Sequence, residues 1–288
     1  MVRKTIITDH RSTLPEEIEA FRDEQWRRTP EVAIENAFGA EALIERVGFC
    51  SALTDARRDG PSIYMAVTGR RDAHMPRNVQ KDPEASLAWN IKDEVMRRGR
   101  VYYAKLARGR AMFLAPRLVP HFNSLWGIPN RRAERDELST EAQAVLKVLR
   151  REWEMASADL RRAAKIENRA AFTRALDELQ RRMLVLPGDV LYSPVFTYVW
   201  TLADARFREK LNLRVSRDEA LREIARAFLD CAGLTVRGEL ARASGLSRPD
   251  AGLGNRALVA ENYAVRPKGA SVGTYMLKNL DERLGFEI

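Results

Sequence analysis

The sequence predicts a helix-rich α+β protein built from three tandem winged-helix units, each a helix-turn-helix followed by a β-hairpin wing. One order of elements occurs three times: an amphipathic helix, two further helices separated by a tight turn, and two apolar strands around a Gly or Pro turn. The 288 residues suffice for two or three small domains with modest cores. We place the units at residues 1–130, 131–212 and 213–288.

The first unit is expected to begin with three helices. Residues 12–16, Ser-Thr-Leu-Pro-Glu, combine a capping residue with Pro and Glu in a first helical turn. A second helix begins at Thr29, and a third covers 40–48 and ends at glycine. Because the third helix carries Glu41 and Glu45, we expect it to bind phosphate poorly.

The rest of the first unit is expected to supply a basic wing. Residues 62–68 are predicted to form a strand, and a helix is predicted over 83–98. Two apolar strands, 101–106 and 111–114, flank an Arg-Gly-Arg tip at 108–110. In winged helices such a hairpin tends to reach a minor groove or the phosphate backbone.

The middle unit has the clearest pattern. Its first helix opens at residues 138–141 and carries Val145, Leu146, Val148, Leu149 and Trp153 at helical spacing. Ser157 is expected to cap a second helix, and a third follows Asn168. The strands 184–186 and 196–200 are predicted to form a hairpin around the turn Pro187-Gly188-Asp189.

The third unit opens at Ser216, which with Glu219 matches a reciprocal capping box. Thr235 is expected to cap its second helix. Glycines interrupt the periodicity over 247–259, so the position of the third helix stays open. Residues 262–278 are predicted to close the unit as a hairpin.

Composition narrows the functional classes. The chain is 45% hydrophobic and 31% charged and has no apolar run of about 18 residues, so we expect no membrane span and a cytoplasmic location. Cys50 and Cys231 lie in apolar contexts, and the three histidines form no ligand spacing. We therefore predict neither a metal site nor a cofactor, and the oligomeric state stays open.

Positive charge predicts double-stranded DNA as the partner, because a basic protein gains free energy by releasing counterions from a polyanion. The formal net charge is +9, and the segment 95–133 holds nine basic residues and no acid. A solvated basic face without a partner is the alternative. The predicted DNA-binding residues lie on this segment and on the third helix of the middle unit: Arg97, Arg98, Arg100, Lys105, Arg108, Arg110, Arg169 and Arg174.

Three segments carry a resemblance to a known family: Ser-Arg-Asp-Glu-Ala-Leu-Arg at 216–222, Thr-Val-Arg-Gly-Glu-Leu-Ala-Arg-Ala-Ser-Gly-Leu at 235–246, and the basic stretch 100–110. With the tandem winged helices, they make the chain resemble the AlkZ/YcaQ-like DNA glycosylases, as a divergent relative. These bacterial enzymes unhook interstrand crosslinks and remove alkylated bases. The resemblance implies hydrolysis of an N-glycosidic bond in duplex DNA.

The resemblance also implies a catalytic Gln-x-Gln or Gln-x-Asp pair that positions a water near the sugar carbon. The single match is Gln80-Lys81-Asp82. It lies later in the chain than the family pattern expects, and it has Lys where an apolar residue is usual. In the alternative interpretation Asp82 caps the helix that starts at Pro83.

A second carboxylate candidate is Asp93, which lies four residues after Trp89 and shares its helix face. An aromatic ring beside a carboxylate suits a pocket for an extruded base, with Trp89 stacking on it. A half-buried Trp beside a surface salt bridge is the alternative. Asp82→Asn and Asp93→Asn are both expected to preserve folding.

Two main hypotheses for the function follow. The first is an AlkZ-like DNA glycosylase, and the second is a noncatalytic DNA-binding protein, either a regulator or an architectural factor. Fold alone does not separate them. In a third, weaker hypothesis the modules bind other proteins, which the acidic helix 40–48 would suit.

Overall fold

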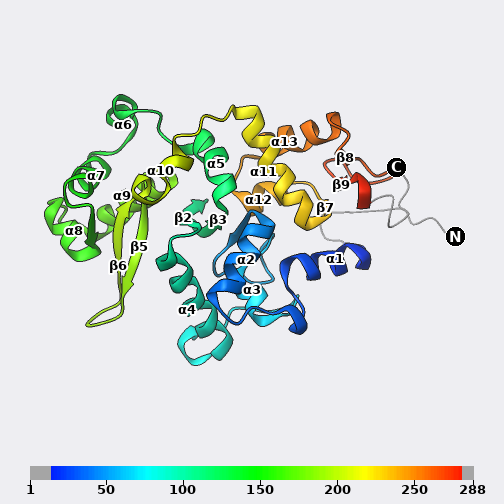
Figure 1. The fold of residues 1–288 in the computed structure, drawn as a ribbon, viewed down its shortest axis with the longest axis horizontal. Helices are drawn as coiled ribbons and strands as arrows, with labels where there is room; N and C mark the ends of the chain where they lie inside the picture. The colour runs from blue at the N-terminus through cyan, green and yellow to red at the C-terminus, as the bar shows by residue number, and fades with distance from the viewer. Residues whose placement is uncertain (1–13, 281–288) are drawn as a thin grey trace.

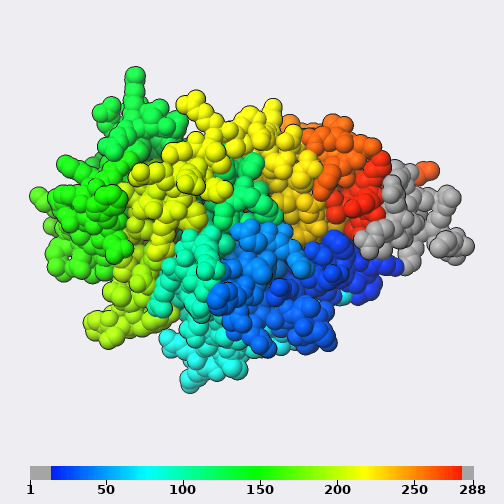
Figure 2. All heavy atoms as spheres, viewed as in Figure 1, coloured from blue at the N-terminus to red at the C-terminus, as the bar shows by residue number. Residues whose placement is uncertain are grey.

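The computed structural model describes residues 14–280 and confirms the helix-rich α+β class. Over this range the strands form three three-stranded sheets, ordered β1-β3-β2, β4-β6-β5 and β7-β9-β8, and all pairings within them are antiparallel. In each sheet the last strand of the unit is central. The middle unit occupies one end of an elongated body, the third unit occupies the other, and the first lies between them (Figures 1 and 2).

Each unit repeats the order helix, strand, helix, helix, strand, strand, which is the winged-helix order. The first has α2 (Ala37–Val47), β1 (Phe49–Ser51), α3 (Ile63–Thr68), α4 (Pro83–Arg98), β2 (Tyr102–Ala107) and β3 (Arg110–Leu114). The second has α7 (Thr140–Glu152), β4 (Glu154–Ala156), α8 (Ser157–Ala163), α9 (Arg169–Arg181), β5 (Val185–Leu191) and β6 (Thr197–Leu202). The third has α11 (Arg217–Ala232), β7 (Leu234–Thr235), α12 (Glu239–Ser244), α13 (Arg248–Ala260), β8 (Ala264–Val265) and β9 (Tyr275–Leu277).

Further short elements precede the units, join them or, in the case of η2, lie between α3 and α4 of the first unit. They are α1 (Glu16–Trp26), η1 (Pro30–Val32), η2 (Val79–Lys81), η3 (Pro116–Leu118), α5 (Val119–Trp126), α6 (Arg131–Glu137) and α10 (Ala203–Leu211). The helix expected at Thr29 is thus only the 3₁₀ turn η1. The predicted cap at Ser12 and Thr13 lies outside the described residues.

The predicted strand at 62–68 is wrong, because these residues form helix α3. All six residues of α3 are buried, so the sequence has no polar face whose period would separate a helix from a strand. Gly69 ends the helix with φ 59°, a left-handed conformation that glycine adopts readily. The correction moves α4, rather than 40–48, into the third-helix position of the first unit.

The middle hairpin turns later than predicted. Pro187-Gly188-Asp189 lies inside β5, where the register with β6 shifts between Pro187 and Asp189. Gly188 lies against α10, and its carbonyl accepts a 2.7 Å hydrogen bond from Arg206. The glycine therefore marks a bulge with a close side-chain approach, as isolated strand glycines often do.

Two predicted caps have other roles. Ser157 donates to the Tyr198 carbonyl (3.1 Å) and accepts from the Trp200 ring nitrogen (2.9 Å), which ties α8 to β6. Thr235 lies in β7, and α12 begins after Gly238 instead. Both hydroxyls lie on or beside strands, so the sheet decides their environment.

The third helix of the last unit, which the sequence left open, is α13. Ser247 caps it by accepting from the Asp250 backbone N–H at 3.2 Å. Its glycines reflect packing, since a Cβ at Gly254 would lie 2.3 Å from the Leu221 carbonyl oxygen on α11. A glycine that lets two helices approach closely therefore produced the interruption in the sequence pattern.

Buried apolar residues form two clusters in the described chain. One belongs to the middle unit, and the other joins the first and third units and reaches α10. An ion pair between Arg22 of α1 and Glu239 of α12 lies inside this shared region at 2.9 Å, with both side chains about 5% exposed or less. The two units therefore share a core, while the division into three domains stays a proposal.

Ser216→Ala is expected to lower the free energy of unfolding by about 1 kcal/mol, because the Ser216 hydroxyl accepts from the Glu219 backbone N–H at 3.2 Å. Urea denaturation of both proteins measures the difference. Ser216→Asp keeps a capping oxygen and should retain wild-type stability. Equal stability of Ser216→Ala and the wild type would show that the cap contributes nothing.

Candidate nucleic-acid interface

Carboxylates from distant parts of the chain pair with four of the nine basic residues in the segment 95–133. The structure contains no isolated basic wing, because long-range pairing occupies four of the predicted DNA-binding side chains. These ion pairs are Arg97–Asp189 (2.8 Å), Arg98–Glu41 (2.6 Å), Arg100–Glu41 (3.5 Å) and Lys105–Asp177 (2.9 Å).

Two arginines at the tip of the β2–β3 hairpin look equivalent in the sequence but have different environments in the structure. Arg110 is half-buried and donates to the Arg242 carbonyl of α12, so it connects the hairpin to the third unit. Burial, and then the neighbouring guanidiniums of Arg58 and Arg108, lower the pKa of Arg110. Arg108 is exposed, with φ 53°. Only Arg108 therefore projects as a wing-tip cation.

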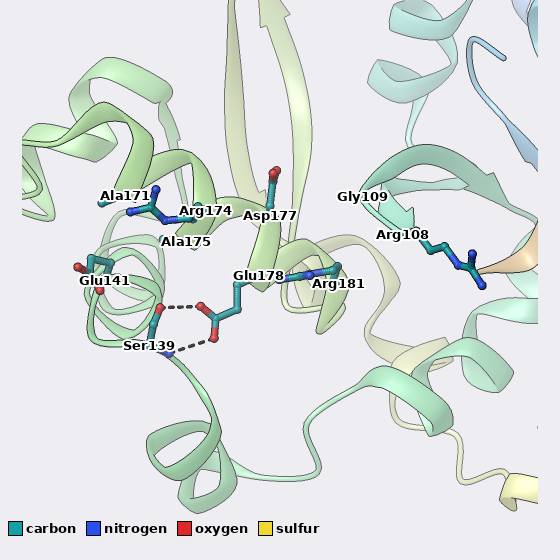
Figure 3. A pocket seen from close by; sticks show the side chains of 10 residues that line it. All are labelled: Arg108, Gly109, Ser139, Glu141, Ala171, Arg174, Ala175, Asp177, Glu178 and Arg181. Carbon is teal, nitrogen blue, oxygen red and sulfur yellow. Dashed lines mark hydrogen bonds between the residues drawn. The ribbon is translucent and has the colours of Figure 1, made fainter. Parts of the chain in front are cut away.

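A pocket of about 500 Å³ lies between the tip of this hairpin and α9, the third helix of the middle unit (Figure 3). Arg108 lines it from the hairpin, and Arg174 and Arg181 line it from α9. All three are exposed, and none has an ion-pair partner among residues 14–280. We call this space the hairpin–α9 pocket.

Arg181 is the arginine of this pocket that the sequence analysis missed. It follows Arg174 by seven residues, which is about two helical turns and places both side chains on one face. That spacing was the available signal. The predicted Arg169 is exposed at the start of α9 and is not among the residues that line the pocket.

Three carboxylates also line the hairpin–α9 pocket, and two have partners. Asp177 pairs with Lys105, and Glu178 accepts from the Ser139 hydroxyl (2.5 Å) and backbone N–H (3.0 Å). Glu141 lies in the first turn of α7. Counting Lys105, the four basic side chains exceed the three acids by one, and the guanidiniums remain available for an anion.

The predicted catalytic pair lies at the start of α4. Gln80 is exposed in η2. Asp82 is half-buried and caps α4, where its Oδ1 accepts from the Ala85 backbone N–H at 2.8 Å. Asp82 therefore caps the helix, as the alternative interpretation predicts. The capping hydrogen bond occupies one of its two carboxylate oxygens.

Asp93 lies in a buried polar cluster and is 1% exposed. Lys92 Nζ lies 2.6 Å from its Oδ1, and the Tyr192 hydroxyl donates to its Oδ2 at 2.6 Å. Burial, and then this hydrogen bond, raise the pKa of Tyr192 to about 12. Lys92 also donates to the Tyr198 hydroxyl at 2.9 Å. Asp93 Oδ2 thus accepts a hydrogen bond from the β5–β6 hairpin, while Oδ1 has the ion pair with Lys92 of α4 and no hydrogen bond.

Trp89 belongs to the same contact between α4 and the β5–β6 hairpin. The Lys92 ammonium lies 4.1 Å from its ring centroid, and the Phe196 ring packs edge-on at 6.0 Å. Asp82 and Asp93 are 11 residues apart on α4, or about 16 Å along its axis. The structure therefore does not bring the two carboxylates to one reacting bond.

Within residues 14–280, no helix is both long and apolar enough to cross a membrane. The same residues contain no group of three or more potential metal ligands.

A family described as AlkZ related matches residues 34–229, which is more than half of the chain. The chain belongs to this family. The match includes α4, the β2–β3 hairpin and α9, so the hairpin–α9 pocket lies entirely within the AlkZ-related region.

One solved structure shows that this AlkZ-related protein has the AlkZ fold. The DNA glycosylase AlkZ of Streptomyces sahachiroi has 15% identity and a TM-score of 0.59, over 93% of this chain and 71% of that one. The DIP2311 protein of Corynebacterium diphtheriae has 17% identity over 95% of this chain and 58% of that one, with a TM-score of 0.21. The comparison with curated proteins gave no match.

Proposed function

We propose that this AlkZ-related protein binds duplex DNA through the hairpin–α9 pocket. The observation that carries the proposal is that three exposed arginines from two winged-helix units, which have no ion-pair partner within residues 14–280, line one space. Arginines bind phosphate oxygens bidentately and release counterions when they do so. Such contacts position a duplex without reading its sequence.

The proposed chemistry is hydrolysis of the N-glycosidic bond of an alkylated or crosslinked base. Family membership supports it, as does the fold shared with a protein named a DNA glycosylase. Asp82 is the first candidate for the essential carboxylate, because it is half-buried at a helix start, whereas Asp93 is enclosed. It would take a proton from water or stabilise the cationic sugar. A cytoplasmic location is part of the same proposal.

Asp82→Asn is expected to lower single-turnover release of an alkylated base by about 10²-fold or more, the scale of a lost acid or base. Folding should persist because Asn caps helices as well as Asp does. The assay incubates the protein with duplexes that contain N7-alkylguanine and measures abasic sites. Asp72→Asn is the charge-matched control, since Asp72 is exposed on the preceding loop.

Two results would contradict the catalytic assignment. Full activity in Asp82→Asn would exclude Asp82 as the essential group. If the wild type binds the alkylated duplex and releases no base, the noncatalytic DNA-binding function replaces the glycosylase proposal.

A further inference from the structure

The third unit contains a larger basic pocket that the proposed function does not use. It measures about 730 Å³ and lies between the helices α12 and α13 and the wing formed by β8 and β9. Arg237, Arg248, Arg256 and Arg266 line it, and its lining in the described part of the chain contains no Asp or Glu. We call it the third-unit pocket. All its lining residues lie beyond the AlkZ-related match at 34–229.

The four guanidiniums come from separate segments that the fold brings together. Arg248 and Arg256 lie on α13, the third helix of the unit, while Arg237 precedes α12 and Arg266 follows β8. All four are exposed, and no ion pair neutralises them within residues 14–280. The acid in the first turn of α13, Asp250, pairs with Arg217 at 2.6 Å. No carboxylate of the described chain therefore compensates the positive charge of the pocket.

Local packing leaves room for these side chains. A Cβ at Gly252 would lie 3.0 Å from Arg256 Nη1, so the guanidinium rests over the glycine. The Arg266 guanidinium lies 5.4 Å from the Tyr275 ring centroid, a cation–π contact that orients it beside the pocket. These contacts hold two of the cations in place without removing their charge.

An unpartnered amide inside the pocket independently indicates a ligand. Asn255 is 6% exposed and lines the pocket, and its buried Oδ1 has no hydrogen-bond partner in the structure. Buried side-chain polar atoms nearly always have a partner, so a single unsatisfied one calls for an explanation. An amide offers both donor and acceptor groups, and a polar ligand beside the four arginines would engage it.

The third-unit pocket is linked to the first unit's hairpin. Arg110 donates to the Arg242 carbonyl, and Arg242 in turn donates to the Arg237 carbonyl at 3.4 Å. The hairpin tip that lines the hairpin–α9 pocket is thus connected through α12 to the third-unit pocket. A linear polyanion suits such a succession of basic sites better than a single phosphate does.

We propose that the third-unit pocket binds the phosphodiester backbone of the same DNA, so that the duplex is held at two separate basic sites. This inference rests on the proposed DNA-binding function. It assigns the third helix and wing of the last unit to backbone contact, with Arg237, Arg248, Arg256 and Arg266 facing phosphates and Asn255 completing the site.

The test replaces these four arginines together by alanine and measures duplex affinity against salt concentration. The slope of log affinity against log salt is expected to fall by three to four, at about 0.9 per lost phosphate contact. The matched control replaces the same four by lysine, which keeps the charge and should keep most of the slope. Asn255→Asp places a carboxylate in the pocket and should also lower the slope, with thermal unfolding as a check of folding.

The outcomes separate this inference from the proposed function. If wild-type protein binds no duplex, the proposed function itself fails. If wild type binds, and removal of Arg108, Arg174 and Arg181 lowers the slope while the alanine changes in the third-unit pocket do not, this inference alone is overturned. Tight binding of a mononucleotide that those alanine changes abolish, with duplex binding unchanged, would also overturn it by assigning the pocket to a small ligand.

Discussion

Replacing Arg108, Arg174 and Arg181 together by alanine is expected to lower duplex affinity about thirtyfold at low salt. Thirtyfold corresponds to about 2 kcal/mol, which lies within the range for three exposed charge contacts of about 0.2–1 kcal/mol each. The slope of log affinity against log salt should fall by about three, because each lost phosphate contact removes about 0.9. Fluorescence anisotropy with a labelled duplex, over about 50 to 200 mM salt, measures both quantities.

The control for this experiment removes the same charge elsewhere. Arg77, Arg208 and Arg214 are exposed and lie outside both basic pockets. Their triple alanine variant should lose little affinity and keep the wild-type slope. If both triple variants lose affinity equally, net charge rather than the hairpin–α9 pocket accounts for binding, and the site assignment is wrong.

Asp93→Asn is expected to lower the free energy of unfolding by about 3–5 kcal/mol. The change leaves the Lys92 ammonium buried without its counter-charge, 2% exposed between α4 and the β5–β6 hairpin. Guanidinium denaturation measures the loss. This burial replaces the expectation from sequence that Asp93→Asn preserves folding.

The double variant Lys92→Met with Asp93→Leu tests whether the unpaired Lys92 charge causes the loss of stability. Removing both charges avoids an unpaired buried ion, so the double variant should be more stable than Asp93→Asn alone. A single Asp93→Asn variant as stable as wild type would show that the Lys92–Asp93 pair is unimportant for folding.

Local signals predicted many elements because they act within a few residues. Asp82 and Pro83 define the start of α4, Gly99 ends it with φ 63°, and the Arg-Gly tip defines the β2–β3 hairpin. Residues 62–68 could not be assigned this way, because full burial removes the periodicity that distinguishes a helix from a strand. Gly188 misled the prediction of the hairpin turn, because this glycine contacts Arg206, 18 residues away, and forms no turn.

The candidate site was predicted only in part, because charge pairing is a tertiary property. Arg98 and Arg108 look equivalent in sequence, yet Glu41, 57 residues away, pairs with Arg98 while Arg108 stays unpaired. Arg108 and Arg174 were predicted, and Arg181 needed the geometry of the pocket. The sequence offers Asp93 as a pocket carboxylate beside Trp89 or as part of a surface salt bridge, but the β5–β6 hairpin, about 100 residues later, covers it.

The most direct test of the central claim is the salt dependence of wild-type binding to an undamaged duplex. With three arginines at the hairpin–α9 pocket and four at the third-unit pocket, the protein should make about six or more phosphate contacts. Affinity is then expected to fall by about 10³-fold or more between about 50 and 200 mM salt. Binding that is absent at low salt, or unchanged over this range, would contradict the claim that this AlkZ-related protein binds DNA through its arginines.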